Sequence, residues 1–188
     1  MPALFPPYAN GLYRAVLIAI PAMAAIALAL PMFYIRMPYA AAVDVPVEQP
    51  VAFDHRHHVR DDGIDCVYCH ETVETAASAG FPTTERCMGC HAQIWPDSPK
   101  LAAVRASWAT GTPIRWKRVD SLPDFVYFHH GVHEAVNIPC GRCHGRVEDM
   151  PRVRRVHRMT MNFCLDCHRD RVGTRAITRI TTCSACHR

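Results

Sequence analysis

Five pairs of cysteines share one spacing, and a histidine follows each pair directly. The cysteines are Cys66, Cys69, Cys87, Cys90, Cys140, Cys143, Cys164, Cys167, Cys183 and Cys186, and the histidines are His70, His91, His144, His168 and His187. A C-x-x-C-H run is the attachment signature of c-type haem. Two thiols bond the vinyl groups of the porphyrin, and the adjacent imidazole binds the iron as its proximal ligand. Because the motifs use every cysteine of the 188-residue chain, we predict five covalently attached haem c groups.

Cysteine pairs of this spacing also occur in zinc sites and in disulfide-bonded proteins. Zinc ribbons use the pairs in twos and need no histidine after each pair, so five pairs would leave half a site over. A disulfide framework would be expected to vary its spacings rather than repeat one of them. Neither alternative accounts for the regular C-x-x-C-H pattern.

Seven histidines lie outside these motifs, which is more than five iron atoms require as second axial ligands. They are His55, His57, His58, His129, His130, His133 and His157. A haem enzyme that converts a substrate such as nitrite or hydroxylamine needs an iron with an open coordination position. The surplus of candidate ligands therefore favours electron transfer, and we predict no catalytic residue.

A short repeat precedes two of the motifs. Residues 53–58 and 128–133 both read F-x-H-x-x-H, and an isoleucine (Ile64, Ile138) stands two residues before the cysteine that follows each run. The repeat divides the haem-binding part into two modules separated by an insert. We predict a dihaem module at residues 53–91, a haem-free insert at 92–123 and a trihaem module at 124–188.

The insert carries one clear local signal. Ser98 and Pro99 precede apolar residues at helical spacing, and Gly111 follows them. Proline in the first turn and glycine just past the end are typical of helix boundaries. We therefore predict a helix here, while the sequence leaves open whether the insert packs the two modules together or faces a partner.

An uncharged apolar stretch of 21 residues lies between Arg14 and Arg36. At about 1.5 Å per residue, a helix of this length spans roughly 32 Å, against a bilayer core of about 30 Å. We predict a transmembrane anchor at residues 1–36, followed by a Pro-rich linker at 37–52. The alternative is a cleaved signal peptide with a cleavage site at residues 40–42, but the apolar part of a signal peptide usually has only about 7–15 residues.

The chemistry of haem attachment also indicates a compartment, because c-type haem is attached outside the cytoplasmic membrane. We therefore expect a single-pass protein of the cytoplasmic (inner) membrane with its haem domain on the periplasmic side. The chain has a formal net charge of +4, and the arginines near the fourth motif are expected to neutralise haem propionates rather than bind nucleic acid. These arginines are Arg152, Arg154, Arg155 and Arg158.

The fold class follows from the density of haems. Roughly 136 residues would hold five porphyrins, which leaves too little chain for a separate apolar core. We expect the porphyrins to form the interior and the apoprotein to be largely unfolded, as in small metal-dependent domains. The predicted fold is mostly irregular with short α-helices, a multihaem cytochrome c domain on one N-terminal transmembrane helix.

The F-x-H-x-x-H runs resemble those of the small class III multihaem cytochromes, so the domain is expected to be class III-like. In that class the first histidine binds the haem of the next motif, and the second binds a later haem. The resemblance implies His55 for the haem of Cys66/Cys69, His58 for Cys87/Cys90, His130 for Cys140/Cys143 and His133 for Cys183/Cys186. The haem of Cys164/Cys167 then has two candidate ligands, His157 and Met161, and a methionine would raise its reduction potential relative to a second histidine.

Nearly the whole chain takes part in a wider resemblance. Its carriers are the single N-terminal apolar segment and the runs PVEQPVAFDHRHH, CVYCH, GFPTTERCMGCHAQIW, LPDFVYFHHGVH, CGRCHGRVEDM and MNFCLDCHR. In this order they resemble the membrane-anchored pentahaem cytochrome c subunits of alternative complex III, a bacterial quinol:acceptor oxidoreductase.

This resemblance implies an electron-transfer subunit that is not an enzyme on its own. Polytopic quinol-binding membrane subunits would oxidise quinol, and electrons would pass through an iron–sulfur subunit and the haems towards a monohaem cytochrome or a terminal oxidase. The alternative is a stand-alone membrane-anchored multihaem quinol dehydrogenase, which oxidises quinol itself. The long Pro-rich linker and the F-x-H-x-x-H repeat fit that alternative less well.

Overall fold

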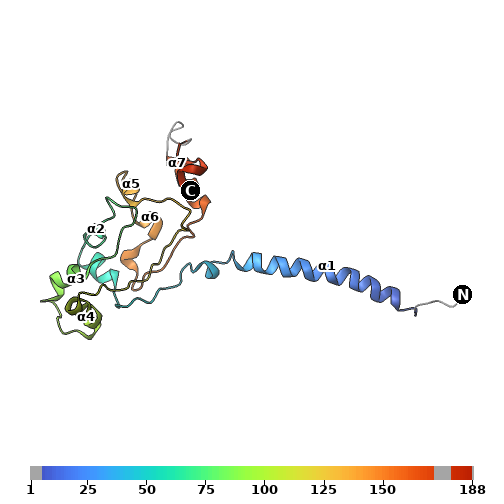
Figure 1. The fold of residues 1–188 in the computed structure, drawn as a ribbon, viewed down its shortest axis with the longest axis horizontal. Coiled ribbons are helices and arrows are strands. Elements are labelled where there is room, and N and C mark those ends of the chain that lie inside the picture. The colour runs from blue at the N-terminus through green and yellow to red at the C-terminus, as the bar shows by residue number, and fades with distance from the viewer. Residues whose placement is uncertain (1–5, 172–178, 188) are drawn as a thin grey trace. The chain divides into compact units, whose positions relative to one another are not determined.

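The computed structural model describes residues 6–171 and 179–187 (Figure 1). The chain separates into two compact units, residues 1–42 and 43–188. Parts of the predicted anchor (residues 1–5) and of the predicted trihaem module (172–178 and 188) lie outside the described residues.

The first unit consists mainly of helix α1, Ala9–Tyr34. Its 26 residues correspond to about 39 Å of helix, enough to cross a bilayer, and its apolar composition also meets that requirement. Pro21 and Pro31 lie inside the helix. A 3-10 turn, η1 (Tyr39–Ala41), follows and ends at Ala42, whose φ is 52°. The prediction of one N-terminal apolar helix is confirmed.

The second unit is built from short helices joined by long irregular segments, as Figure 1 shows. In chain order these are η2 (Arg56–Asp61), α2 (Cys66–Cys69), α3 (Thr84–His91), η3 (Pro99–Leu101), α4 (Ala102–Thr110), α5 (His130–Glu134), α6 (Gly141–His144), η4 (Val147–Asp149), α7 (Met161–Arg171) and α9 (Cys183–Cys186). Within the described ranges there is no β-strand, and extended pairing is confined to isolated bridges. The predicted mostly irregular fold with short helices is confirmed.

Every C-x-x-C-H motif lies in or beside a helical turn. The two cysteines are three residues apart, so one turn places both sulfurs on the same helix face. In the first motif, His70 N donates to Cys66 O at 2.9 Å and closes the turn, while the Asp65 side chain caps it by accepting from Val67 N. The local sequence thus positions two thiols and one imidazole together.

Few side chains of the second unit are fully buried. Among the described residues the buried apolar ones are Val51, Val104 and Met150. In place of an apolar core the unit encloses a cavity of about 2460 Å³. This agrees with the expectation that the protein alone does not fill its own interior.

The predicted helix of the insert is present as η3 and α4. Gly111 ends α4 in the left-handed conformation, with φ 66°, which glycine adopts without strain. Ser98 makes no side-chain capping bond. Helix α4 packs against α3, where Thr84 and Ser107 share a hydroxyl hydrogen bond of 2.5 Å.

Residues 43–49 of the predicted linker belong to the second unit and bond to its other segments. Asp44 N donates to Arg155 O at 2.8 Å, and Val47 N donates to Val153 O at 3.0 Å. Gln49 and Lys117 exchange two hydrogen bonds of 2.8 and 2.9 Å. This stretch therefore packs along the haem domain rather than standing free of it.

Three arginines near the fourth motif have carboxylate partners within the protein. Arg152 pairs with Glu48, Arg154 with Asp44 at 3.3 Å, and Arg155 with Asp120 at 3.0 Å. Two of these carboxylates are brought close because the chain before the first motif runs along residues 153–155. The neutralisation of propionates by these arginines stays a prediction.

Gly131 marks a close approach between two motifs. Its N donates to Ala76 O at 3.3 Å, and a Cβ added here would overlap the carbonyl group of Glu74. We expect Gly131→Ala to lower the free energy of unfolding of the haem-loaded protein by about 1–3 kcal/mol, the usual cost of overpacking. Denaturant titration followed by the visible haem spectrum measures this change.

Gly141→Ala is the matched control, because nothing lies within 4 Å of a Cβ at that position. Other motifs carry Val67 and Leu165 at the equivalent place. An equal loss of stability in both variants would mean that the contact with Glu74 does not matter.

Candidate haem site

The two F-x-H-x-x-H runs have the same local geometry. The ring of Phe53 lies edge-on to His55 at 4.8 Å and stacks on His58 at 4.4 Å. Phe128 repeats this arrangement, edge-on to His130 at 4.8 Å and tilted over His133 at 4.7 Å. In each run one phenylalanine therefore packs between two imidazoles and fixes their directions.

The second histidine of each run is also fixed by its own backbone. His58 Nδ1 lies 3.1 Å from Asp54 O, and His133 Nδ1 lies 2.9 Å from His129 O. A carbonyl oxygen only accepts, so Nδ1 must carry the proton. The lone pair of a neutral imidazole is then on Nε2, where it can bind a metal.

A residue with positive φ precedes the isoleucine of each repeat. Gly63 has φ 70° and Asn137 has φ 55°, and glycine and asparagine are the residues that adopt this conformation most readily. The turn lets Ile64 N donate to His58 O at 2.9 Å and Ile138 N donate to His133 O at 3.1 Å. The two runs therefore share the same backbone conformation as well as the same spacing of residues.

Most of the other candidate ligands show the same Nδ1 pattern. Nδ1 lies within hydrogen-bonding distance of a backbone carbonyl in His70 (Gly80, 2.9 Å), His91 (Ile94, 3.0 Å), His130 (Ala77, 2.8 Å) and His168 (Ile180, 3.3 Å). In His144 the partner is a carboxylate, Asp120 Oδ2, at 3.1 Å. These contacts hold Nε2 of each ring free for iron, as outer-shell partners of metal-bound histidines do.

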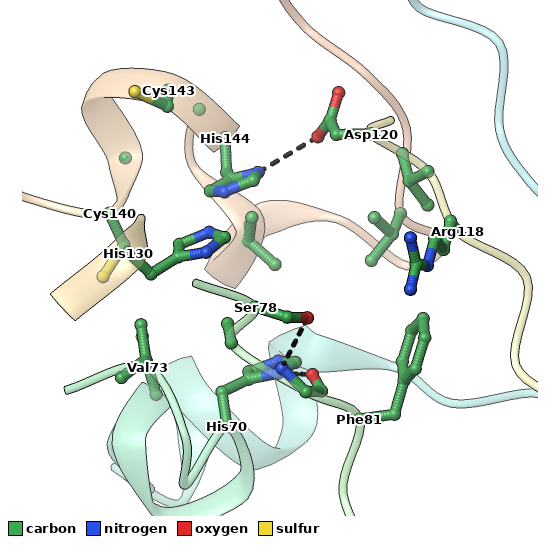
Figure 2. Close-up of a pocket in the computed structure, with 18 of the residues that line it drawn as sticks. His70, Val73, Ser78, Phe81, Arg118, Asp120, His130, Cys140, Cys143 and His144 are labelled. Carbon is green, nitrogen blue, oxygen red and sulfur yellow. Dashed lines mark hydrogen bonds and ion pairs between the residues drawn. The ribbon is translucent and has the colours of Figure 1, made fainter. Parts of the chain in front are cut away.

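Three pairs of histidine rings lie at the separation that an iron between them requires. The ring centroids are 6.1 Å apart for His58 and His91, 6.3 Å for His130 and His144 (Figure 2), and 6.1 Å for His133 and His168. Metal–nitrogen bonds of about 2.0–2.1 Å on both sides of one metal put two imidazole centroids roughly 6.3 Å apart. Each pair therefore has room for one bis-histidine iron.

His55 lies close to His70 in the first motif. Burial lowers the pKa of His55 to about 4, and the nearby His70 and His58 oppose its charging further. The imidazole is therefore neutral near pH 7, as an iron ligand must be. Its Nδ1 is buried without a protein partner.

The ring positions can be compared with the ligand assignments made from the sequence, which stay predictions. His55, His58 and His130 lie near the motifs to which they were assigned. His133 was assigned to the haem of Cys183/Cys186, and its ring faces His168 of the fourth motif. The two runs are alike in this respect, because in each run the second histidine faces the second motif that follows it.

His157 and Met161, the two candidate ligands of the fourth haem, do not face His168. The ring that faces His168 is that of His133. His157 is exposed and stacks on Phe163 at 5.2 Å, outside the residues that line the cavity. Met161 lines the cavity, with 63% of its surface exposed. His187 of the fifth motif stacks beside Phe125 at 5.9 Å.

His57 and His129, to which the resemblance assigned no iron, also have definite positions. His57 stacks on Trp95 at 5.6 Å, and its Nε2 lies 3.6 Å from the carboxylate of Asp62. His129 contributes its carbonyl to His133. The Nε2 atom of His57 therefore points towards the carboxylate of Asp62 rather than towards an iron site.

One cavity is lined by all the residues of the five attachment motifs that would bind haem. All ten motif cysteines and all five motif histidines line it. Trp116 also lines the cavity, and its Nε1 donor is buried without a protein partner, as a site for a haem carboxylate would require.

The ten cysteines of the motifs are not paired with one another. Among the described residues, no group of three or more histidine, cysteine, aspartate or glutamate side chains is placed to hold a metal ion unaided. The residues present therefore fit covalent haem attachment, in which the porphyrin supplies the other metal ligands.

Thiols of different motifs interact with one another. Burial raises the pKa of these thiols, and neighbouring thiols raise it further. The interacting neighbours are Cys66 with Cys140, Cys69 with Cys87, Cys143 with Cys164 and Cys167, and Cys164 with Cys186. The first motif thus adjoins the second and the third, the third adjoins the fourth, and the fourth adjoins the fifth.

Asp120 is a site residue that the sequence analysis missed. Burial raises its pKa, but its hydrogen bonds and ion pairs with His144 and Arg155 outweigh burial, so its pKa lies below the ordinary value. It is 24 residues from His144 in the sequence. No local motif connects the two positions, so the sequence offered no signal for the contact.

The short helices and the shared attachment cavity define a multihaem cytochrome c domain. Residues 126–188, one third of the chain, match the family model of cytochrome c7 and related cytochrome c. That segment includes the third, fourth and fifth C-x-x-C-H motifs.

The chain is also similar to the protein named menaquinone reductase, multihaem cytochrome c subunit, of Nitratidesulfovibrio vulgaris. The two are 35% identical over 98 residues, which is 52% of this chain. The chain spans less than half, 46%, of the length of that relative.

Adjacent histidines offer a test of the ligand geometry. We expect His58→Ala to leave one ferric haem high-spin, because it removes the imidazole that faces His91. His57→Ala should leave the spin states unchanged, because His57 faces Asp62. Electron paramagnetic resonance of the oxidised protein measures both, and a high-spin signal from His57→Ala alone would contradict the assignment.

Proposed function

We propose that this chain is the electron-transfer subunit of a quinone-linked membrane complex and that it carries five haem c groups as a continuous wire. The observation that carries the proposal is the single cavity lined by all ten cysteines and all five histidines of the motifs, which brings the five attachment sites together. We propose the order of the haems from the motifs that adjoin one another. Numbered by their order in the sequence, the haems run second, first, third, fourth, fifth. Each attachment site thereby has a neighbour to which an electron can pass.

The paired histidines support electron transfer rather than catalysis at four of the irons. The proposed axial pairs are His55/His70, His58/His91, His130/His144 and His133/His168. A six-coordinate iron has no open position for a substrate. The Nδ1 contacts orient the imidazoles of His58, His70, His91, His130, His133, His144 and His168, which fits irons that keep the same ligands in both oxidation states.

The link to a quinone rests on the relative and on α1. The similar protein of N. vulgaris is named as a multihaem subunit of a menaquinone reductase, and α1 fits a single-pass anchor by length and composition. We propose an inner-membrane location with the haem domain on the periplasmic side. In this arrangement the chain supplies a wire close to a membrane-bound quinone site.

At a finer level we propose a subunit of alternative complex III. Its partners would be an iron–sulfur subunit, polytopic quinol-binding membrane subunits and a monohaem cytochrome of the same complex. Electrons from quinol would cross the five haems to a periplasmic cytochrome or a terminal oxidase. The order of the segments along the whole chain supports this assignment.

Purification of the tagged full-length chain from native membranes tests the proposal. We expect an iron–sulfur protein and polytopic membrane subunits to copurify with it, and we expect five haems per chain by pyridine haemochrome and intact mass. Recovery of the chain without any partner under mild detergent conditions would contradict the subunit assignment.

The stand-alone quinol dehydrogenase is separated by a second measurement. The chain purified alone is mixed with a reduced menaquinone analogue, and haem reduction is followed by stopped-flow absorbance. We expect slow reduction without partners and fast reduction in the purified complex. Equally fast reduction of the isolated chain would favour the stand-alone enzyme.

The pairing of His133 with His168 has its own test. If the two residues bind one iron, the double variant His133→Ala/His168→Ala perturbs one haem, whereas ligands of different irons would perturb two. Quantified high-spin or lost haem per chain measures the difference. His157→Ala is the control, and we expect it to leave all the haems low-spin because His157 packs on Phe163.

A further inference from the structure

The proximal histidine of the third motif differs from others in the partner of its Nδ1. The proximal histidines of the first, second and fourth motifs bond backbone carbonyls. His144 Nδ1 instead lies 3.1 Å from Oδ2 of Asp120, as Figure 2 shows. Arg155 Nε donates to the other carboxylate oxygen at 3.0 Å, and Arg155 also donates to Val119 O at 3.1 Å.

We propose that Asp120 is a positioning residue that lowers the reduction potential of the haem on Cys140/Cys143 by acting through His144. A carboxylate that accepts the Nδ1 proton increases the electron density of the imidazole and its basicity as a ligand. The more basic ligand stabilises the oxidised iron over the reduced iron. One electron enters or leaves the iron, and the proton stays on Nδ1 between His144 and Asp120.

The partial burial of Asp120 strengthens the effect of its negative charge on the iron. The side chain of Asp120 is only 20% exposed and that of Arg155 is 23% exposed, so water screens this site less than it screens surface pairs. The negative charge near the iron favours the oxidised state. Arg155 opposes part of this effect, but it contacts the outer carboxylate oxygen, whereas the hydrogen bond to His144 acts on the ligand itself.

The lowered potential of the third haem affects electron flow along the five haems. This consequence rests on the proposed function. In the order second, first, third, fourth, fifth, the third haem lies in the middle. A lowered potential there makes the central haem harder to reduce than it would be without Asp120. Asp120 then adjusts the height of the step that electrons cross between the two ends.

Asp120→Asn in the full-length, haem-loaded protein tests the inference. The amide keeps the size of the side chain and removes its charge. We expect the reduction equilibrium of one low-spin haem to shift at least about tenfold towards the reduced state, which is about 59 mV for a one-electron couple. A redox titration followed by electron paramagnetic resonance resolves that haem from the others.

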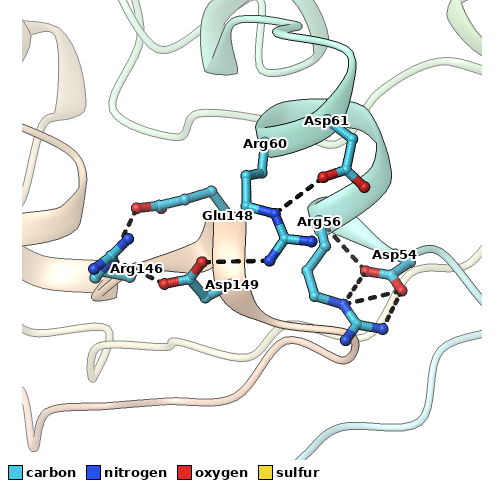
Figure 3. A network of polar contacts seen from close by, with 7 residues as sticks. All are labelled: Asp54, Arg56, Arg60, Asp61, Arg146, Glu148 and Asp149. Carbon is cyan, nitrogen blue, oxygen red and sulfur yellow. Dashed lines mark hydrogen bonds and ion pairs between the residues drawn. The ribbon is translucent and has the colours of Figure 1, made fainter.

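Asp149→Asn is the matched control, because it removes the same charge close to the same motif. Asp149 bonds to Arg146 at 2.9 Å and lies 3.8 Å from Arg60, so its partners are arginines rather than a haem ligand (Figure 3). We expect less than a twofold shift from this variant. A shift equal to that of Asp120→Asn would overturn the proposal, because the loss of any negative charge near this motif would then have the same effect.

Arg155→Met provides a change of opposite sign. It removes the positive charge that opposes Asp120, so we expect the reduction potential of the same haem to fall. If Asp120 and Arg155 only held the structure together, the two variants would not shift this potential in opposite directions. Unchanged potentials in low-spin Asp120→Asn, or a rise in Arg155→Met, would overturn the proposal. Because these potentials belong to the chain itself, the result is independent of which partners copurify with it.

Discussion

Two thioether bonds to one helical turn are the constraint on which the rest of this domain depends. A porphyrin that is tethered at positions i and i+3, with its iron ligand at i+4, needs only one turn of helix. Helices α2, α6 and α9 are therefore no longer than that attachment requires. The chain between the turns is irregular, and its apolar side chains line the same cavity as the motif cysteines and histidines instead of packing into a core of their own.

The parts of the fold that the sequence predicted are those whose cause is local. The spacing within each C-x-x-C-H motif, the helix between Pro99 and Gly111, and the apolar length of α1 all depend on residues within a few turns of one another. The F-x-H-x-x-H runs also belong to this group. One phenylalanine between two histidines, and a turn with positive φ before the isoleucine, form the same structure in both repeats.

The parts that could not be predicted depend on contacts between distant segments. His133 reaches His168 across 35 residues, and Asp120 reaches His144 across 24. The arginines near the fourth motif carry no mark that distinguishes a propionate from Asp44 or Glu48 as a partner. The resemblance to class III cytochromes assigned His133 to the fifth motif. The internal repeat of this chain points instead to the fourth motif, the second one after the run, just as His58 faces the second motif after its own run.

One histidine explains why the proposed wire does not follow the order of the sequence. His130 faces His144 of the third motif, but its Nδ1 and its backbone N both bond Ala77 O, in the loop that follows the first motif. The same residue thus joins the third haem site to the first. The close approach of Gly131 to Glu74 holds this contact tightly, so the first site lies between the second and the third.

The insert that lacks a haem motif completes this arrangement. Helix α4 packs on α3, which carries the second motif, and Asp120 at the far end of the insert bonds His144 of the third. Between them, Trp116 stacks on Phe81, which follows the first motif, at 6.4 Å. A segment without a C-x-x-C-H motif therefore contacts three of these motifs or the chain beside them. One of its carboxylates also makes the third motif chemically unlike the first, second and fourth, whose histidines bond backbone carbonyls.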